Sequence, residues 1–379
     1  MTLCALWTLA LLAYTYFGYP VVIGLLARLR PGGSAARTAR AADDAAPREV
    51  SVSAFLPVFN GAALLRAKIT SLLEQDYPPA LLDVLVYCDG CTDDTEATAR
   101  ALAAEPRAAG RIRVVASAER RGKPAAINAL RALAGGELLL LNDARQPLSR
   151  GSVRALARAL GDPQVGCATG NLVLAGGAPS GVYWKYEHWI RRQESRFRGV
   201  VGMTGAIAMM RRAELDPLPE DLILDDVWIP ARLGLRGERV ALVADAEAYD
   251  TAFEDEQEFR RKVRTLAGNY QLFALVPALL SPFANPFWFE LVSHKVLRLV
   301  APWLMLVLAA TSTAAALAGG GSRGLPAALV VAQAAFYGAA AAGRRAGRLA
   351  GVARTFVVLN LAAVVGLVKY VSGRQRVTW

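Results

Sequence analysis

The sequence predicts an α/β domain with a parallel sheet, placed between membrane-spanning segments at the two ends of the chain. Apolar strand-like runs alternate with helical patterns through the middle of the 379 residues. Because parallel strands need a helical crossover, this alternation is typical of a parallel sheet with helices on both faces. Apolar residues make up 54% of the chain and are concentrated towards both ends. We therefore expect one α/β domain over 49–250 and membrane segments on either side of it.

The strands and helices of the expected domain follow one another at short intervals. The helix at 64–73, for example, has its apolar residues at helical spacing. No GxGxxG follows the first strand and no GxxxxGK[ST] is present, so neither a dinucleotide cofactor nor a P-loop is expected. In chain order the expected elements are a strand at 50–56, a helix at 64–73, a strand ending at Asp89, a helix at 96–104, a strand at 111–116, a helix at 124–133 and a strand at 137–142.

Residues 1–28 are expected to form a transmembrane helix. From Thr2 to Ala27 the only polar groups are hydroxyls, one Cys and an indole, and the run is long enough to cross a bilayer. A cleavable signal peptide is the alternative, but no basic region precedes the run and its apolar stretch is longer than usual. Arginines follow at positions 28, 30, 37 and 40, the last three in a linker over 29–48. By the positive-inside rule they place the next domain in the cytoplasm.

The region 285–379 is expected to hold about three more transmembrane helices. Candidate spans are 297–319, 325–343 and 355–368, of which the last is short. Arginines between 344 and 354 form a basic loop that fits the cytoplasmic side. The basic tail after 368 would then lie outside. Either the last segment is re-entrant, or the tail departs weakly from the rule.

The charge and the cysteines exclude some classes of function. The formal net charge is +11, but no RNA- or DNA-binding motif is present, so nucleic acid is not an expected partner. Much of the excess lies beside apolar segments, where it suits anionic headgroups or a diphosphate. Cys88 and Cys91 have CxxC spacing without a second pair or a nearby His, which favours a structural role over zinc or redox chemistry. His188 and His294 are also expected to be structural.

Three groups of acids indicate chemistry on a charged substrate at a membrane. Asp89 and Asp143 each end an apolar run, where a parallel sheet presents catalytic or metal-binding groups at its carboxyl edge. Asp225 and Asp226 follow later between bulky apolar residues, which disfavours a solvated turn. Asp89 is expected either to accept hydrogen bonds from a base or ribose, or to form an Asx turn.

One basic residue of the domain stands in a position to bind an anion. Lys123 lies in a glycine turn before an expected helix, from which a cation can reach a phosphate or a base. A solvated surface lysine is the alternative.

Several motifs, in this order, resemble those of family 2 glycosyltransferases. They are Pro57-Val-Phe-Asn60, Cys88-Asp-Gly-Cys-Thr-Asp-Asp-Thr95, Arg121-Gly-Lys-Pro-Ala-Ala-Ile-Asn128, Asn142-Asp-Ala-Arg145, Met203-Thr-Gly-Ala206 and Leu224-Asp-Asp226. The resemblance covers about the whole 49–250 domain. It implies a GT-A fold (Rossmann-like), a nucleotide-diphosphate sugar donor, and transfer with inversion.

The resemblance also implies roles for residues on the donor side. Contacts to the nucleotide sugar are implied for Pro57, Phe59, Asn60, Asp89, Lys123, Asp143 and Arg145. Asp143 matches the first acid of the family's DxD motif, which holds Mg²⁺ or Mn²⁺ on the diphosphate. Arg145 replaces the second acid and cannot ligate a metal. Since Mg²⁺ needs only one or two carboxylates, Asp143 alone could suffice. Arg145 would either contact the diphosphate or face away.

On the acceptor side the resemblance implies that Asp226 is the general base and Asp225 its support, with Thr204 and Gly205 nearby. Arg261 and Arg264 lie in the region 251–284, expected to be an amphipathic interface helix. They would face the diphosphate, lipid headgroups, or both. The family's Gln-x-x-Arg-Trp motif of processive members is not found there, which puts synthesis of long polymers in doubt.

The expected protein is therefore a multi-pass enzyme of the bacterial inner membrane with a cytoplasmic catalytic domain. It would transfer a sugar, with inversion, from a nucleotide-diphosphate sugar to a lipid or lipid-linked glycan at the inner leaflet. A processive polysaccharide synthase is one alternative. A catalytically inactive glycosyltransferase-like scaffold is the other, and Arg145 is its only support.

Overall fold

The computed structural model describes residues 1–29, 49–108, 110–175, 181–251, 255–318 and 324–378. Two compact units share the chain. We call one the α/β unit; it comprises Ile23–Ala252, Val276–Phe287 and Arg376–Trp379. The other is the helical unit, comprising Met1–Val22, Phe253–Leu275 and Trp288–Gln375.

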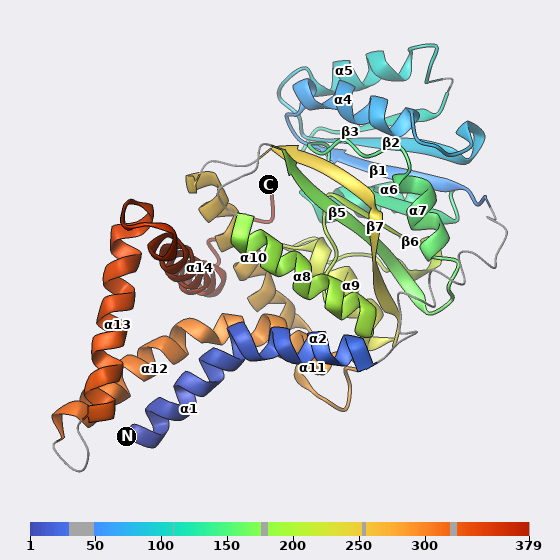
Figure 1. Ribbon diagram of the computed structural model, residues 1–379. Coiled ribbons are helices and arrows are strands. Elements are labelled where there is room, and N and C mark those ends of the chain that lie inside the picture. Colours follow the sequence, from blue (N-terminus) through green and yellow to red (C-terminus); the bar gives the residue numbers. More distant parts are fainter. Residues whose placement is uncertain (30–48, 109, 176–180, 252–254, 319–323, 379) are drawn as a thin grey trace. The chain divides into compact units, whose positions relative to one another are not determined.

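The α/β unit contains a seven-stranded mixed sheet in the order β3-β2-β1-β4-β6-β5-β7 (Figure 1). β2, β1 and β4 pair in parallel as expected, whereas β6 runs antiparallel to both β4 and β5. The expectation of a parallel sheet thus holds for β3, β2, β1 and β4, whereas the sheet as a whole is mixed because the short antiparallel strand β6 lies between β4 and β5. The strands are β1 Val52–Val58, β2 Leu82–Asp89, β3 Ile112–Ser117, β4 Leu138–Asn142, β5 Val165–Ala175, β6 Ile207–Arg211 and β7 Arg239–Thr251.

Helices cover both faces of this sheet. Every residue of β1 is buried, so alternate side chains of the strand supply two separate cores. Leu56 packs with α4, α5 and α7 on one face, whereas Phe55 packs with α6 and α9 on the other. In Figure 1, α4 and α5 lie together over one end of the sheet. The helices of the unit are α4 Ala62–Leu73, α5 Thr95–Ala103, α6 Lys123–Leu133, α7 Ser152–Ala159, α8 Gly181–Phe197 and α9 Asp225–Leu235.

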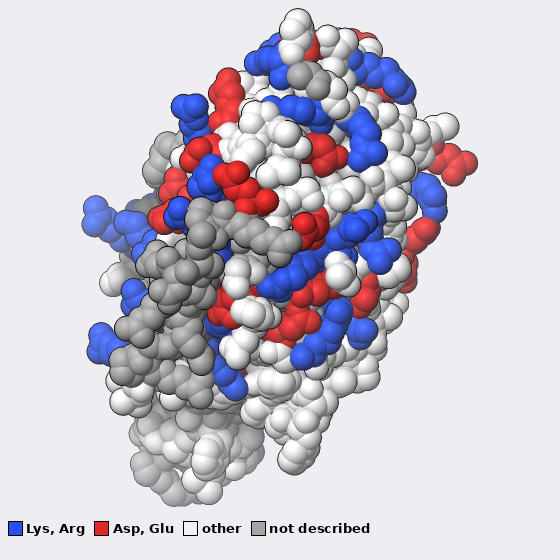
Figure 2. Space-filling view, turned by 90° about the vertical axis from the view of Figure 1, so that its right-hand side faces the viewer, with Lys and Arg blue, Asp and Glu red and all other residues white. Residues whose placement is uncertain are grey.

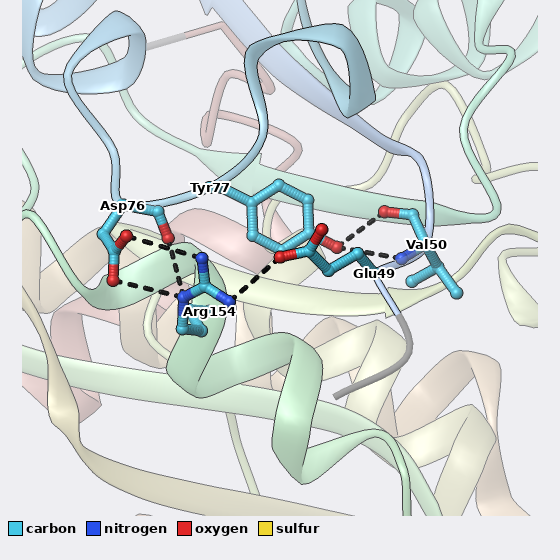
Figure 3. Close-up of polar contacts among 5 residues, drawn as sticks. All are labelled: Glu49, Val50, Asp76, Tyr77 and Arg154. Atoms are coloured by element: carbon cyan, nitrogen blue, oxygen red, sulfur yellow. Dashed lines mark hydrogen bonds and ion pairs between the residues drawn. The ribbon is translucent and has the colours of Figure 1, made fainter. Parts of the chain in front are cut away.

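A polar clasp fixes the entry to β1 (Figure 3). The Tyr77 hydroxyl donates to the carbonyl of Val50 at 2.6 Å and accepts from its N–H at 3.1 Å. Arg154 of α7 joins Glu49 at 3.2 Å to Asp76 at 3.1 Å. These contacts bind the start of the central strand to two neighbouring segments, so that the register of β1 is set from its first residue.

The helical unit holds most of the apolar ends of the chain. Four helices of the described residues are long and apolar enough to cross a membrane: Thr2–Leu29, Trp288–Leu317, Gly324–Ala342 and Arg348–Val371. The first is built from α1 Thr2–Ala13, a π-helical turn η1 Tyr14–Gly18 and α2 Tyr19–Leu29. The second is built from α11 Trp288–Leu291, a π-helical turn η5 Val292–Val296 and α12 Leu297–Leu317. The others are α13 Gly324–Ala342 and α14 Arg348–Val371.

The last helix is longer than the short segment expected from the sequence. α14 has 24 residues, enough for a span without a re-entrant turn. It packs closely on α10, Asp255–Leu275, because Gly366 has no side chain: a Cβ there would lie 3.0 Å from the Ala267 nitrogen. Small residues at such contacts are typical of helices that associate in lipid.

Basic residues of α10 pair with acids of the same helix. In α10, Arg260 binds Glu256 at 2.6 Å, and Arg261 and Lys262 lie 3.6 and 3.5 Å from Glu258. On the face drawn in Figure 2, acidic and basic side chains are interspersed. The net positive charge is therefore distributed on this face and does not form a continuous basic surface there.

Candidate active site

The candidate site begins where the central strands end. Asn60 follows β1 with a positive φ of 46°, a conformation that Asn tolerates better than most residues. Its side chain donates to the Thr92 hydroxyl at 3.0 Å and accepts from the Thr92 N–H at 2.8 Å. Phe59 beside it is covered by Arg120, whose guanidinium carbon lies 3.5 Å from the ring centroid. Asn60 thus braces the loop after β2, and Phe59 offers an aromatic surface capped by a cation. Pro57 is buried inside β1.

Asp89 is fully buried at the end of β2. Its two carboxylate oxygens accept the N–H groups of Arg121 and Gly122, each at 2.8 Å. The geometry differs from an Asx turn with Gly90, because the carboxylate clamps a loop more than thirty residues later in the chain. This loop leads directly into α6, so Asp89 fixes the position from which Lys123 projects.

Lys123 is the charged centre of the site. Its ammonium lies 2.8 Å from Oδ1 of Asp143 and 3.0 Å from Oδ2 of Asp225. Burial would lower the pKa of Lys123, but the two carboxylates outweigh it and hold this pKa above its usual value. Lys123 is not a solvated surface lysine, because only 13% of its side chain is exposed. The three residues come from the start of α6, the end of β4 and the start of α9.

Gly205 lies where these groups converge. A Cβ built at this residue would lie 3.4 Å from Oδ2 of Asp143, 3.6 Å from the Lys123 ammonium and 3.9 Å from Oδ2 of Asp226. A lysine and two carboxylates from three separate segments thus lie around one position that carries no side chain. The neighbouring Thr204 N–H donates to the Thr169 hydroxyl at 2.9 Å, which holds this loop in place.

Asp225 and Asp226 form the first turn of α9. The unpaired N–H groups of a helix start favour carboxylates there. The N–H of Met203 donates to the carbonyl of Asp226 at 3.0 Å, which links this turn to the loop of Gly205. Arg191 of α8 donates to the carbonyl of Gly202 at 3.3 Å. Burial lowers the pKa of Arg191, and the charge of Asp226 is among those that oppose this shift.

Arg145 forms an ion pair and a hydrogen bond with residues of β7. Its Nε lies 2.6 Å from Oδ1 of Asp250, whose side chain is almost completely buried, and its Nη2 donates to the Thr251 carbonyl at 3.0 Å. Gln146 donates to the other oxygen of Asp250 at 2.8 Å. The residue that departs from the DxD pattern therefore has a clear structural task. It anchors the loop after β4, which also carries Asp143.

A second lysine stands behind this loop. Lys68 of α4 is completely buried and donates to the Gln146 carbonyl at 2.6 Å. Burial lowers the pKa of Lys68 to about 7, while the Asp143 carboxylate acts in the opposite direction. Sequence reasoning missed this residue, although a signal exists: it stands on the apolar face of α4, between Leu65 and Leu72. Arg191 was missed because nothing in its local sequence points towards Asp226.

The residues present fit a divalent cation only if the substrate completes its coordination. Within the described ranges, no group of three or more His, Cys, Asp or Glu side chains could hold a metal ion. Asp143 is 38% exposed and directs Oδ2 towards the space at Gly205. A single carboxylate suits Mg²⁺ or Mn²⁺ when diphosphate oxygens and waters supply the other ligands.

The remaining candidate residues lie on other helices and strands than the charged groups around Gly205. Burial raises the pKa of Cys88 to about 12, which disfavours thiolate chemistry. His188 stacks on Trp184 with ring centroids 3.6 Å apart. Arg261 and Arg264 belong to α10, in the helical unit.

Comparison with known proteins identifies the kind of domain that carries these residues. Residues 53–217 match the model of glycosyl transferase family 2. An N-acetylglucosaminyltransferase of Rhizobium meliloti (strain 1021) is 32% identical over 179 residues, which are 44% of this chain and 41% of that protein. The chain thus matches less than half the length of that relative. A mannosyltransferase from Pyrobaculum calidifontis, solved in complex with GDP-Man and Mn²⁺, is 26% identical, with a TM-score of 0.73 over 98% of this chain and 99% of that chain.

Residues 53–217 of this chain therefore carry a glycosyl transferase family 2 domain. The expected GT-A fold is confirmed, with the antiparallel strand β6 as the correction to its predicted topology.

Proposed function

We propose that this protein transfers a sugar from a nucleotide-diphosphate sugar to a lipid or lipid-linked glycan acceptor, with inversion at the anomeric carbon. The observation that carries the proposal is the convergence of Lys123, Asp143 and the Asp225–Asp226 pair around Gly205. A cation, a carboxylate that could hold a metal and a candidate base meet around one glycine, as transfer from a diphosphate requires.

In the proposed reaction, Asp226 accepts the proton of the acceptor hydroxyl as that oxygen attacks the anomeric carbon. The bond from this carbon to the diphosphate oxygen breaks while the new glycosidic bond forms on the opposite face, and the nucleoside diphosphate leaves. Lys123 stabilises the charge that develops on the leaving group. Asp225 keeps Lys123 in place from the other side. A divalent cation held by Asp143 would supply further neutralisation of the diphosphate.

The donor-side residues have supporting roles. Asp89 fixes the loop that leads to Lys123, and Arg145 with Lys68 fixes the loop that leads away from Asp143. Phe59 and Asn60 stand at the same edge of the sheet, where a nucleotide base and ribose would lie. Thr204 and Gly205 border the acceptor.

The proposed location is the inner membrane of a bacterium, with the four candidate spans in the bilayer and the α/β unit in the cytoplasm. Its support is the arginines that follow the first span and the positive-inside rule. Nucleotide sugars and the acceptor would then reach the site from the cytoplasmic side.

The test uses the full chain, purified in detergent, with GDP-mannose and UDP-N-acetylglucosamine as separate donors. These two probes follow from the names of the similar proteins. We expect release of GDP or UDP that requires Mg²⁺ or Mn²⁺ and stops in excess chelator, together with label in a lipid extract. The absence of nucleotide release with a broad panel of donors would favour the inactive scaffold. A ladder of long products would favour a processive synthase.

A further inference from the structure

Two π-helical turns face each other inside the helical unit. η1 interrupts the first candidate span at Tyr14–Gly18, and η5 interrupts the second at Val292–Val296. The hydroxyls of Tyr14 and Ser293, one from each turn, lie 2.9 Å apart. π-helical turns are rare and occur often at functional sites, because they are less stable than the α-helix they interrupt.

Aromatic and polar side chains from three candidate spans gather around these turns. Tyr19 lies 5.9 Å from His294 between ring centroids, and the Arg298 guanidinium carbon lies 6.0 Å from the Tyr16 ring. Asn360 of α14 reaches the Tyr16 hydroxyl at 3.5 Å. We call this group the polar cluster; its members are Tyr14, Tyr16, Tyr19, Ser293, His294, Arg298 and Asn360, together with Lys295, which follows His294 in η5.

The polar cluster carries net positive charge within an otherwise apolar helix. Lys295 and Arg298 are cationic and partly exposed, His294 is almost completely buried, and the buried Glu290 lies about one turn before His294. Ionisable groups in a membrane span are costly, and those that are kept commonly bind ions or substrates. Helix packing alone would be served as well by apolar residues.

Two of the chain connections between the units lie close to the cluster in the sequence. The first span leaves the helical unit after Val22, three residues from Tyr19, and the second enters at Trp288, next to Phe289, whose ring contacts Tyr19. At about 1.5 Å per residue of helix, these connections are within roughly one turn of the cluster. Lys295 and Arg298 thus lie in the first half of the candidate span Trp288–Leu317, on the side at which the chain enters it from the α/β unit.

We propose that the polar cluster binds the phosphate group of a lipid, through Lys295 and Arg298 with His294 and the tyrosine hydroxyls as further donors. Basic side chains and hydroxyls are the groups that recognise phosphate oxygens, and they bind more strongly where water is scarce. This inference rests on the proposed lipid acceptor. The proposed phosphate site lies within the helical unit alone.

The test measures lipid binding directly, without donor nucleotide. The full chain is placed in phosphatidylcholine nanodiscs, and bound polyprenyl phosphate is quantified by native mass spectrometry. We expect the wild type to bind and Arg298→Gln to bind at least about tenfold more weakly, whereas Arg298→Lys keeps most of the affinity. Lys369→Gln, at the end of α14, is the matched control and should bind like the wild type.

A second variant keeps the test decisive if Arg298→Gln does not fold. Lys295 is partly exposed, and Lys295→Gln should also weaken the binding of polyprenyl phosphate. Wild-type affinity in folded samples of both variants would overturn the inference. Competition by phosphatidic acid distinguishes a general lipid-phosphate site from a site for the acceptor. If phosphatidic acid displaces polyprenyl phosphate equally well, the site binds lipid phosphates in general. If it does not, the acceptor is the specific ligand. Bound polyprenyl phosphate without any sugar transfer would instead count against the proposed function alone.

Discussion

The ammonium of Lys123 lies 2.8 Å from Oδ1 of Asp143, although the two residues belong to different strand–helix units of the sheet. Asp225 approaches the same ammonium at 3.0 Å from the start of α9. One cation thus holds together two acids that would otherwise repel each other.

Replacing Lys123 by Met should reduce transfer strongly and also destabilise the α/β unit. The change leaves Asp143 and the buried Asp225 without their shared cation, which typically costs about 1–3 kcal/mol. The measurements are nucleoside diphosphate release and the thermal midpoint in detergent. Lys185→Met, an exposed position in α8, is the control. Unchanged turnover in Lys123→Met would remove this residue from the reaction.

Gly205→Ala should leave the fold intact but impair donor use. The new Cβ would stand in ordinary contact at 3.4 Å from Asp143, so little strain is expected. It would nevertheless fill the space around which the charged groups converge, and we expect a loss of roughly tenfold or more in kcat/KM. Gly135→Ala is the matched control, because no atom lies within 4 Å of its added Cβ. Equal kcat/KM for the two variants would contradict the proposed position of the substrate.

Asp226→Asn should nearly abolish transfer while nucleotide-sugar binding stays close to normal. An amide cannot accept the acceptor's proton, and loss of a general base typically costs about 10²–10⁴-fold in rate. Steady-state transfer and donor binding by calorimetry are the two measurements. Transfer at the wild-type rate would show that another group is the base.

Stability should fall as the pH drops from about 6.5 towards 4. Burial, together with the charges of Arg191 and Arg192, lowers the pKa of His188 from 6.5 to about 4. The unfolded chain therefore binds a proton in this window that the folded chain does not, so His188 favours unfolding as the pH falls. Because the residue is only partly buried, an effect of order 1 kcal/mol is expected. In His188→Gln the thermal midpoint should depend less on pH between 6.5 and 4.5 than in the wild type. The same pH dependence in both proteins would contradict this prediction.

The α/β unit and the loop before α14 should face the cytoplasm. Single cysteines at Ser322, which lies outside the described residues, and at exposed Arg345 would be tested in a background without Cys4, Cys88, Cys91 and Cys167. Arg345 is preferable to Gly347, whose φ of 102° disfavours any side chain. An impermeant thiol reagent on intact cells should label the first site only. The reverse pattern would overturn the topology and the cytoplasmic source of the donor.

Local sequence was sufficient for the first half of the sheet and for the identity of the charged groups. β1, β2 and β4 are continuous apolar runs, and Asp89 and Asp143 stand at their ends because a parallel sheet exposes that edge. The antiparallel β6 was not predicted, since a five-residue strand carries little periodic signal and its direction depends on its neighbours.

The sequence by itself determined which residues are chemically able to act: the acids, Lys123 and a glycine between them, together with apolar segments long enough to cross a membrane. Only the tertiary structure decided how they pair. Lys123 meets Asp225, Arg145 turns to Asp250, and Tyr14 meets Ser293 across 279 positions of the chain. Such pairings depend on strand order and helix packing, which bring distant segments within a few ångströms, and no local pattern of residues encodes them.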